Sequence, residues 1–502
     1  MASPETLRAQ VSTCTLVGVQ AVPVTVEIEV GPGLPGMHIV GRADSSVQES
    51  SQRMRCACRA AGFTVPSDRK IVVNLAPASV PKHGTGFDLP IAVAYLVATG
   101  QLDAATVEGR LIVGELGLNG SVNDTEGLFA YALEAQKRDM CLLSGQASSC
   151  MPELSGLRHE CIDHLAQLRT GERDSPRPPD ARCAAGPSAD FKDVVGQQAA
   201  VRALTIAAAG RHGVMLIGPP GSGKSMLARR LPSILPPLSQ QERIETALVH
   251  SVAGLDLSSI VVGTRPFRSP HHSATMASLV GGGRTLRPGE ASLAHHGVLF
   301  LDELGEFSSM TLQALRQPIE EGRIVLCRAD GSATFPASFQ LVCASNPCPC
   351  GYLGDAEHSC SCSESQISRY RGKLGGPLKD RIDLICEVRR VDPARVLESG
   401  GGASSAQIAA EVARAREFAR GRGAHDEALA SSIPAEVIEA CGLNRRQRRF
   451  IEDTARRHQL SGRGIIRVLR VARTIADLEC SSLVSDEHIC ESFMYRVENA
   501  LE

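Results

Sequence analysis

Aromatic residues are scarce in this sequence. It contains no tryptophan, and aromatic residues make up 3% of its 502 positions. Proteins that hold single-stranded nucleic acid by base stacking need aromatic rings, so this scarcity disfavours that mode of recognition. Long apolar runs are also missing, because none approaches the roughly 18 to 20 residues that cross a bilayer. We therefore expect no membrane partner.

Two further absences concern the cellular setting. The opening segment MASPETLRAQ has no basic stretch followed by an apolar one, so it does not resemble a signal peptide. The 17 cysteines are odd in number, and no disulfide framework follows from them. We expect a cytoplasmic protein with reduced thiols, in which clustered cysteines indicate metal binding and scattered ones indicate packing.

The chain also lacks an excess of charge of either sign. Lys and Arg total 53, Asp and Glu total 55, and the formal net charge is −2. This balance excludes a uniformly basic nucleic-acid coat, although local basic patches remain compatible with it. Hydrophobic residues at 43% and charged residues at 22% are typical of a folded globular chain.

Composition divides the chain into three blocks. Residues 1–175 mix β-branched runs with helical stretches at 89–97 and 128–137, which predicts an α+β domain. Proline, charged and small residues dominate a predicted linker at 176–189. Strand-like and helical segments alternate in 190–391, as in a parallel doubly wound α/β sheet, and 392–502 has the composition of a helical domain.

A phosphate-binding loop follows the first strand pattern of the second block. The apolar run 214–217 leads into GPPGSGKS, which matches G-x-x-x-x-G-K-[ST] and continues as a helix. Its glycines let backbone N–H groups surround phosphate oxygens, while Lys224 supplies a charge and Ser225 a Mg²⁺ ligand. The predicted nucleotide contacts are Gly218, Pro219, Pro220, Gly221, Ser222, Gly223, Lys224 and Ser225.

Two later strands end in polar residues suited to hydrolysis. The run GVLFL ends at Asp302 and Glu303, and we expect its strand to lie beside the phosphate loop. Asp302 would bind Mg²⁺ and Glu303 would polarise the attacking water; a capped helix start is the alternative interpretation. Asn346 follows a third strand-like run, where it would orient that water or simply form a turn before Pro347.

Arg381 lies beyond the predicted strands of the sheet. It could stabilise charge on a γ-phosphate, most naturally that of a neighbouring subunit. A surface ion cluster with Asp380 and Asp383 is the alternative.

These residues together carry a resemblance. The segments GPPGSGKS, GVLFLDEL, SNPCPCGY and GPLKDRID resemble AAA+ ATPases of the magnesium-chelatase subunit I type. RPFRSPHH at 265–272 and PGEASLAH at 288–295 narrow the resemblance to the ComM/YifB group of bacterial AAA+ proteins, over nearly the whole chain. The resemblance implies a P-loop parallel-sheet core followed by a helical lid.

The resemblance also implies a function. It indicates a homohexameric ring with ATP and Mg²⁺ at subunit interfaces, in which Arg381 is an arginine finger. Arg463 matches a second sensor arginine in the lid, which would complete the site of its own chain. Lys379 departs from the apolar residue usual in the family. Members of the group are DNA helicases that promote branch migration in homologous recombination during natural transformation.

The first block resembles the Lon-protease-like (S5-type) domain that this family carries. Such proteases use a serine nucleophile and a lysine base, but the matching positions here hold Gly86 and Phe129. Neither side chain can attack a carbonyl or carry a proton. We therefore expect a scaffold domain, and an ATP-dependent protease is a disfavoured alternative.

An insertion at 348–362 contains four cysteines in the pattern C-x-C-x₉-C-x-C. Four thiolates so close in sequence can bind Zn²⁺ tetrahedrally. The candidate zinc ligands are Cys348, Cys350, Cys360 and Cys362, with a loop of free cysteines as the alternative.

Arginines in two inserts are candidate contacts for single-stranded or branched DNA. The stretch 263–287 carries no acid, and a predicted hairpin turns at 329–331. Phosphate contacts carry no base information, so we expect selectivity for DNA structure. The candidates are Arg265, Arg268, Arg284, Arg287, Arg323 and Arg328. The lid is also rich in arginine between 440 and 475, where contact with DNA and pairing with acids of an adjacent subunit are equally favoured.

The sequence thus predicts an ATP-dependent hexameric DNA motor. A chelatase-type motor that remodels a protein partner is the first alternative, and a DNA-binding scaffold without ATP hydrolysis is another. The intact Glu303 and Arg381 disfavour the scaffold.

Overall fold

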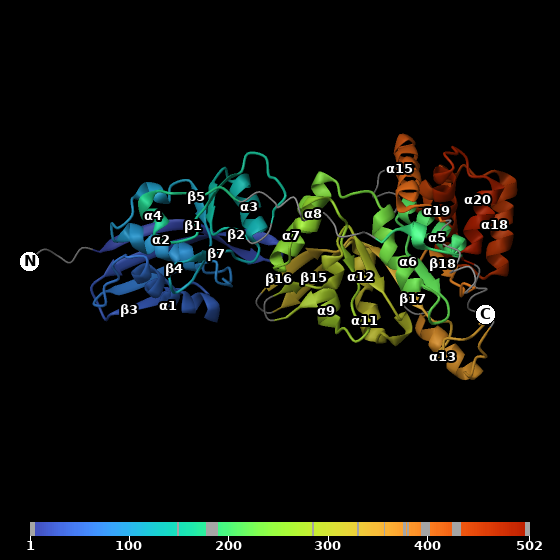
Figure 1. Ribbon diagram of the computed structural model, residues 1–502, viewed down its shortest axis with the longest axis horizontal. Helices are drawn as coiled ribbons and strands as arrows, with labels where there is room; N and C mark the ends of the chain where they lie inside the picture. The colour runs from blue at the N-terminus through green and yellow to red at the C-terminus, as the bar shows by residue number, and fades with distance from the viewer. Residues whose placement is uncertain are drawn as a thin grey trace, which may run out of the picture.

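Three bodies follow one another along the molecule. The computed structural model describes residues 6–147, 150–176, 189–283, 286–328, 331–355, 357–374, 378, 381–392, 402–423 and 433–496. Figure 1 shows the N-terminal body at one end, the parallel-sheet core in the middle and the C-terminal helices at the other end. The predicted linker lies almost wholly outside the described residues, as does Arg284.

The N-terminal body is a mixed sheet with strand order β3-β4-β2-β1-β5-β8-β9. The long antiparallel pair β1–β2 is its centre, and the inward side chains of β2, such as Val26 and Ile28, are fully buried beneath α1 and α2. Its elements are β1 (Leu7–Val17), β2 (Gln20–Gly31), β3 (Gly36–Val40), α1 (Ser45–Ala60), β4 (Lys70–Ala76), α2 (Asp88–Ala98), β5 (Arg110–Ile112), β6 (Glu115–Leu116), β7 (Val122–Asn123), α3 (Leu128–Lys137), β8 (Cys141–Ser144), β9 (Arg158–Cys161) and α4 (Gln167–Thr170).

The central body is a parallel sheet with strand order β11-β14-β17-β10-β18. Its strands are β10 (Val214–Ile217), β11 (Phe267–Arg268), β14 (Val298–Leu301), β17 (Gln340–Ser345) and β18 (Leu384–Glu387). Alternate residues of β10 enter two different hydrophobic cores, Val214 one and Met215 the other. Both faces of the sheet are therefore covered, as continuous apolar strands require.

The strand order corrects one expectation. The strand that ends at Asp302 does not lie beside the strand of the phosphate loop, because β17 is inserted between β14 and β10. Asn346 consequently lies between the loop and the two acids.

Helices and hairpins surround this sheet. They are α5 (Gln198–Gly210), α6 (Lys224–Arg230), α7 (Gln240–Val252), α8 (Ser258–Val261), α9 (Met276–Val280), β12 (Gly281–Gly282), β13 (Arg287–Pro288), α10 (Glu290–Leu293), α11 (Ser309–Ala314), α12 (Arg316–Glu321), β15 (Arg323–Arg328), β16 (Gly331–Pro336) and α13 (Glu364–Leu374). The C-terminal body, or lid, consists of α15 (Ser405–Gly421), α17 (Pro434–Cys441), α18 (Arg445–Arg457), α19 (Gly462–Leu478) and α20 (Asp486–Met494). None of the helices in the described ranges has the length and apolar character of a membrane span.

An apolar joint connects the N-terminal body to the core. Phe129 on α3 is fully buried among Leu238, Ala247 and Leu257 of the core. The first turn of α3 has no side-chain cap of its own; instead, Ser251 Oγ of α7 accepts a hydrogen bond from the Phe129 N–H at 3.2 Å. The position at which a protease would need its lysine thus packs two bodies together.

Removal of the Phe129 ring should loosen this joint. Truncation of a buried phenylalanine costs about 3–5 kcal/mol, so F129A should lower the first thermal transition of the full chain by several degrees in calorimetry. F129L retains most of the apolar contact and should unfold close to the wild type. An unchanged transition in F129A would contradict the role of this ring in the joint.

Candidate active site

The phosphate loop curls at the carboxyl end of β10. Gly221 and Gly223 have φ values of +78° and +91°, which side chains with a Cβ rarely adopt. Lys224 is buried, and its Nζ donates to the carbonyl oxygens of Gly218 at 2.7 Å and Pro219 at 2.9 Å. Burial lowers the pKa of Lys224, an effect that the charges of Asp302 and Glu303 oppose. The loop thus holds a single cation among backbone groups, as phosphate binding requires.

Two oxygen ligands suited to Mg²⁺ meet beside this lysine. Ser225 Oγ donates to Asp302 Oδ2 at 2.6 Å, and the Glu303 N–H donates to Asp302 Oδ1 at 3.0 Å. Hard divalent cations take oxygen ligands of this kind, so the pair fits Mg²⁺. When bound, the ion would neutralise charge on the β- and γ-phosphates.

Asn346 completes the set at the carboxyl edge of the sheet. It follows β17, and its Oδ1 accepts a hydrogen bond from Lys224 Nζ at 3.3 Å. The structure therefore brings together Lys224, Ser225, Asp302, Glu303 and Asn346, all expected from the sequence. Ligands of open α/β sheets bind at this edge.

His272 is a neighbour of Glu303 that the sequence did not predict. Its Nδ1 lies 3.1 Å from Glu303 Oε2, and its ring lies against His271 with centroids 4.1 Å apart. Glu303 itself has a positive φ of +52°. This contact places an imidazole beside the group expected to polarise the attacking water.

Arg381 lies at the amino ends of the core strands, opposite the phosphate loop. It precedes β18, whose first residue pairs with the first residue of β10. The phosphate loop instead follows the last residue of β10. The strand between them spans roughly 10 Å. Arg381 pairs with Glu320 on α12, and its pKa is lowered by burial and by the positive charges of Arg316, Arg463 and Arg467.

Arg463 lies near Arg381, because its positive charge contributes to the lowered pKa of that arginine. The buried carboxylate of Asp383, just before β18, attracts two arginines of α19: Arg467 at 3.6 Å and Arg470 at 4.0 Å. Burial would raise the pKa of Asp383, but Arg470, His212 and Arg467 hold it well below its usual range. Arg467 and Arg470 thus anchor α19 at the end of the strands where Arg381 lies, and a role for Arg463 at the phosphate loop of its own chain stays a prediction.

The expected DNA contacts separate into two groups. Arg265 pairs with Glu242 at 3.0 Å, and Arg268 with Glu290 at 2.6 Å, so both are engaged within the core, and DNA contact by either stays a prediction. Arg287 pairs with Glu126 of the N-terminal body at 2.8 Å. The hairpin β15–β16 presents Arg323 and Arg328 to solvent, with Arg323 3.5 Å from Glu321.

The four cysteines of the insertion converge. Cys348 Sγ lies 3.3 Å from Cys350 Sγ and 3.7 Å from Cys360 Sγ, and all four sulfurs lie within 4.8 Å of one another. A tetrahedron with Zn–S bonds of about 2.3 Å places its sulfurs about 3.8 Å apart, so the donor set fits Zn²⁺. Glu245, His295 and His296 also converge, but His295 Nδ1 accepts the Ser338 N–H at 3.0 Å, which leaves the proton on Nε2 and disfavours metal binding there.

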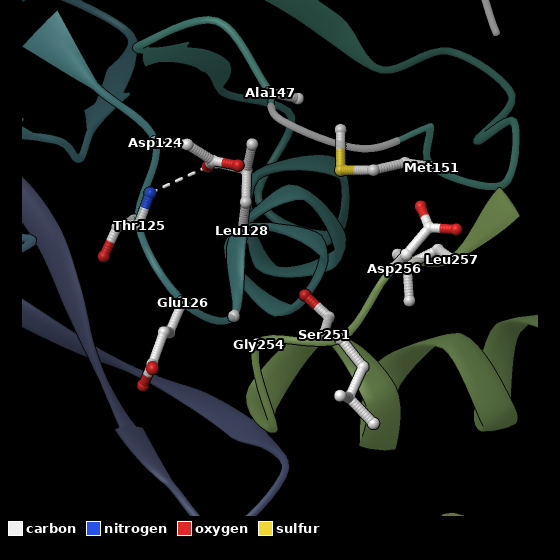
Figure 2. A pocket seen from close by; sticks show the side chains of 12 residues that line it. Asp124, Thr125, Glu126, Leu128, Ala147, Met151, Ser251, Gly254, Asp256 and Leu257 are labelled. Atoms are coloured by element: carbon white, nitrogen blue, oxygen red, sulfur yellow. Dashed lines mark hydrogen bonds between the residues drawn. The ribbon is translucent and has the colours of Figure 1, made fainter. Parts of the chain in front are cut away.

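A pocket of about 440 Å³ lies between the N-terminal body and the core, away from the phosphate loop. Figure 2 shows Asp124, Glu126 and Asp256 around it, together with Leu128 and Met151. Its lining includes the Ser251 hydroxyl that caps α3, but no lysine or histidine that could activate a nucleophile. The pocket therefore lacks the elements of a protease site.

Comparison with known proteins agrees with this architecture. Residues 190–396 match the family described as magnesium chelatase, subunit ChlI; residues 26–143 match subunit ChlI of Mg-chelatase, and 402–496 match the C-terminal part of that subunit. A YifB protein of Salmonella typhimurium is 41% identical over 98% of both chains, and competence protein ComM of Haemophilus influenzae is 40% identical over 95% of both. The chain belongs to the ComM/YifB family of magnesium-chelatase-like AAA+ proteins.

Membership of this family bears on the ligands of the phosphate loop. AAA+ membership supports use of ATP and Mg²⁺ at the phosphate loop. A magnesium-chelatase 67 kDa subunit of Chlorobaculum parvum matches less of the chain, with 30% identity over 161 residues, 31% of this chain and 23% of that protein. The Lon-like character of the N-terminal body stays a prediction.

Loss of the His272 ring should release Glu303. H272A should raise ATP turnover in the absence of any other ligand several-fold, because the carboxylate no longer pairs with imidazole. H271A is the matched control, since no contact joins His271 to Glu303 among the described residues, and it should behave as the wild type. Lower turnover in H272A would contradict a restraining role.

Proposed function

We propose that this protein is a ring-forming ATPase that moves single-stranded or branched DNA, with branch migration as its task. ATP binds at the carboxyl ends of the core strands of one subunit. Arg381 and Arg463 of the next subunit complete the site. The observation that carries the proposal is the position of Arg381 at the opposite end of strand β10 from its own phosphate loop, with Arg463 close enough to Arg381 to lower its pKa. A homohexamer is the ring that the family resemblance implies.

Each residue then has a role in hydrolysis. Lys224 holds the β- and γ-phosphates, Ser225 and Asp302 hold Mg²⁺, Glu303 orients and polarises the attacking water, and Asn346 positions it. The trans arginines stabilise charge that develops as the γ-phosphoryl group is transferred. In the ring, Arg381 would exchange its Glu320 carboxylate for a phosphate.

The DNA part of the proposal is supported by the two inserts. A Cβ at Gly281 of strand β12 would lie 3.3 Å from Leu326 Cδ1 of the β15–β16 hairpin, so the inserts lie side by side. The hairpin also contacts the N-terminal body, because Val19 of the β1–β2 turn is buried with Ala333 and Phe335 of β16. Its exposed arginines, Arg323 and Arg328, fit phosphate oxygens.

ATP turnover tests the DNA motor. Turnover with Mg²⁺ should rise several-fold with single-stranded or four-way-junction DNA. E303Q should lower it about 10²-fold or more with or without DNA, since it removes the base. Turnover indifferent to every DNA tested would contradict the proposal and favour a chelatase-type motor acting on a protein partner, which the family match also supports.

Mixed rings test the direction in which the arginines act. E303Q and R463A subunits should each be inactive alone, yet a mixture should recover part of the wild-type turnover. In a mixed ring, an intact Glu303 of one subunit meets an intact Arg463 of its neighbour only if Arg463 acts in trans. The E303Q and R381A pair should recover in the same way. No recovery with R463A would mean that Arg463 serves its own chain, as the sequence first suggested.

We also propose that the four cysteines hold a structural zinc ion. The insertion rests on the phosphate loop, because Gly351 packs against Pro220. Arg390 also bridges the two: it pairs with Asp355 at 3.0 Å and donates to the Pro220 carbonyl oxygen at 3.4 Å. An ordered insertion would therefore support both the loop and Asn346, which lies two residues before the first cysteine.

Metal analysis tests this assignment. The purified chain should contain about one zinc, and the C360S/C362S variant should contain almost none and should bind ATP more weakly. The control C480S/C490S removes two exposed cysteines of the lid and should retain the metal. A metal-free wild-type chain would contradict a zinc site.

A further inference from the structure

Helix α18 presents a row of arginines to solvent. Its buried face consists of Gln447, Ile451 and Ala455, which pack into the lid. The opposite face carries five exposed arginines and two acids, and none of these arginines makes an ion pair within the part of the chain that is described. We call this the α18 arginine face: Arg445, Arg446, Arg449, Arg456 and Arg457.

The stability of the helix does not account for the three arginines near its start, whereas Arg456 and Arg457 in the last turn suit the helix dipole. Asn444 and Gln447 form a capping box that fixes its start, and the apolar face fixes its position in the lid. Cations in the first turn oppose the helix dipole, and Arg445 and Arg449 are like charges one turn apart. Glu452 and Asp453 are close in sequence, yet neither pairs with an arginine among the described residues. The sequence therefore keeps a local electrostatic cost that an external polyanion would relieve.

The geometry of the face suits a nucleic-acid backbone. With 100° per residue, Arg445, Arg449 and Arg456 fall within a strip about 40° wide, and with a rise of 1.5 Å they span about 16 Å. Guanidinium groups bind phosphate oxygens in a bidentate manner, and about 16 Å corresponds to roughly five base steps of DNA. Figure 1 places α18 at the end of the molecule opposite the N-terminal body, whereas the β15–β16 hairpin contacts that body.

We propose that the α18 arginine face binds the phosphate backbone of DNA as a second contact region, separate from the hairpin inserts. The proposal rests on the DNA-motor function above and extends it to a surface outside the ATPase site. Two separate contact regions would let one subunit hold two parts of a branched molecule. This surface reads no bases, so it adds affinity and selectivity for DNA structure.

DNA binding measured over a range of salt concentrations tests the proposal. Fluorescence anisotropy with a labelled four-way junction should show that R445Q/R449Q raises Kd about tenfold. The slope of log Kd against log salt should fall by about two, one for each lost phosphate contact. R445K/R449K keeps the charges and should restore most of the slope. R414Q/R420Q removes two exposed arginines from α15 of the same lid and should leave Kd unchanged.

The outcomes separate this inference from the proposed function. All variants should form rings of the same mass and keep their ATP turnover without DNA, because α18 lies outside the ATPase site. Equal losses in the α18 and α15 variants would overturn the inference, as would wild-type affinity and slope in R445Q/R449Q. Rings that fall apart in R445Q/R449Q would also overturn it and would make α18 a subunit contact. A wild-type chain that binds no DNA would contradict the motor itself.

Discussion

The parallel direction of the five core strands is the constraint on which the site depends. Because all strands run the same way, the turns after β10, β14 and β17 gather at one edge, and the residues before β18 gather at the other. Phosphate, metal and water ligands therefore converge around Lys224, while Arg381 is left on the far side. This division of the site is the geometric basis of our proposal that a second subunit supplies the missing cations.

One buried charge fixes the lid to the second edge. Asp383 would be costly to bury alone, and its partners are His212 at 3.1 Å and the arginines of α19. His212 in turn contacts Thr474 of α19 at 2.8 Å through its other ring nitrogen. The position of Arg463 at the start of α19 follows from this anchor. The lid and the segment that carries Arg381 therefore form one unit.

The N-terminal body is joined to the core at two places. Phe129 and the first turn of α3 join it to α7, and the β1–β2 turn packs against β16. Gly18 in that turn has a φ of +62°, and a Cβ there would lie 3.2 Å from Ala333, so the close approach needs glycine. The body thus contacts both helix α7 and the hairpin that we propose for DNA binding.

Local patterns in the sequence were sufficient for the elements and for the phosphate site. β10 and α3 have the predicted bounds, and Ser225, Asp302 and Asn346 meet as expected, because each follows or begins an element with a clear apolar pattern. Contacts between residues that are distant in the sequence could not be predicted from local patterns. The insertion of β17 beside β10, the Arg268–Glu290 pair and the contact of His272 with Glu303 all depend on how elements pack.

The most direct test is the structure of the assembled ring with Mg²⁺, ADP and aluminium fluoride. The account predicts that Arg381 and Arg463 of one subunit lie within about 3 Å of the fluoride ligands bound at the Lys224 loop of the next subunit. It would be contradicted if both arginines remained roughly 10 Å or more from every bound nucleotide, or if Arg463 reached the nucleotide of its own chain.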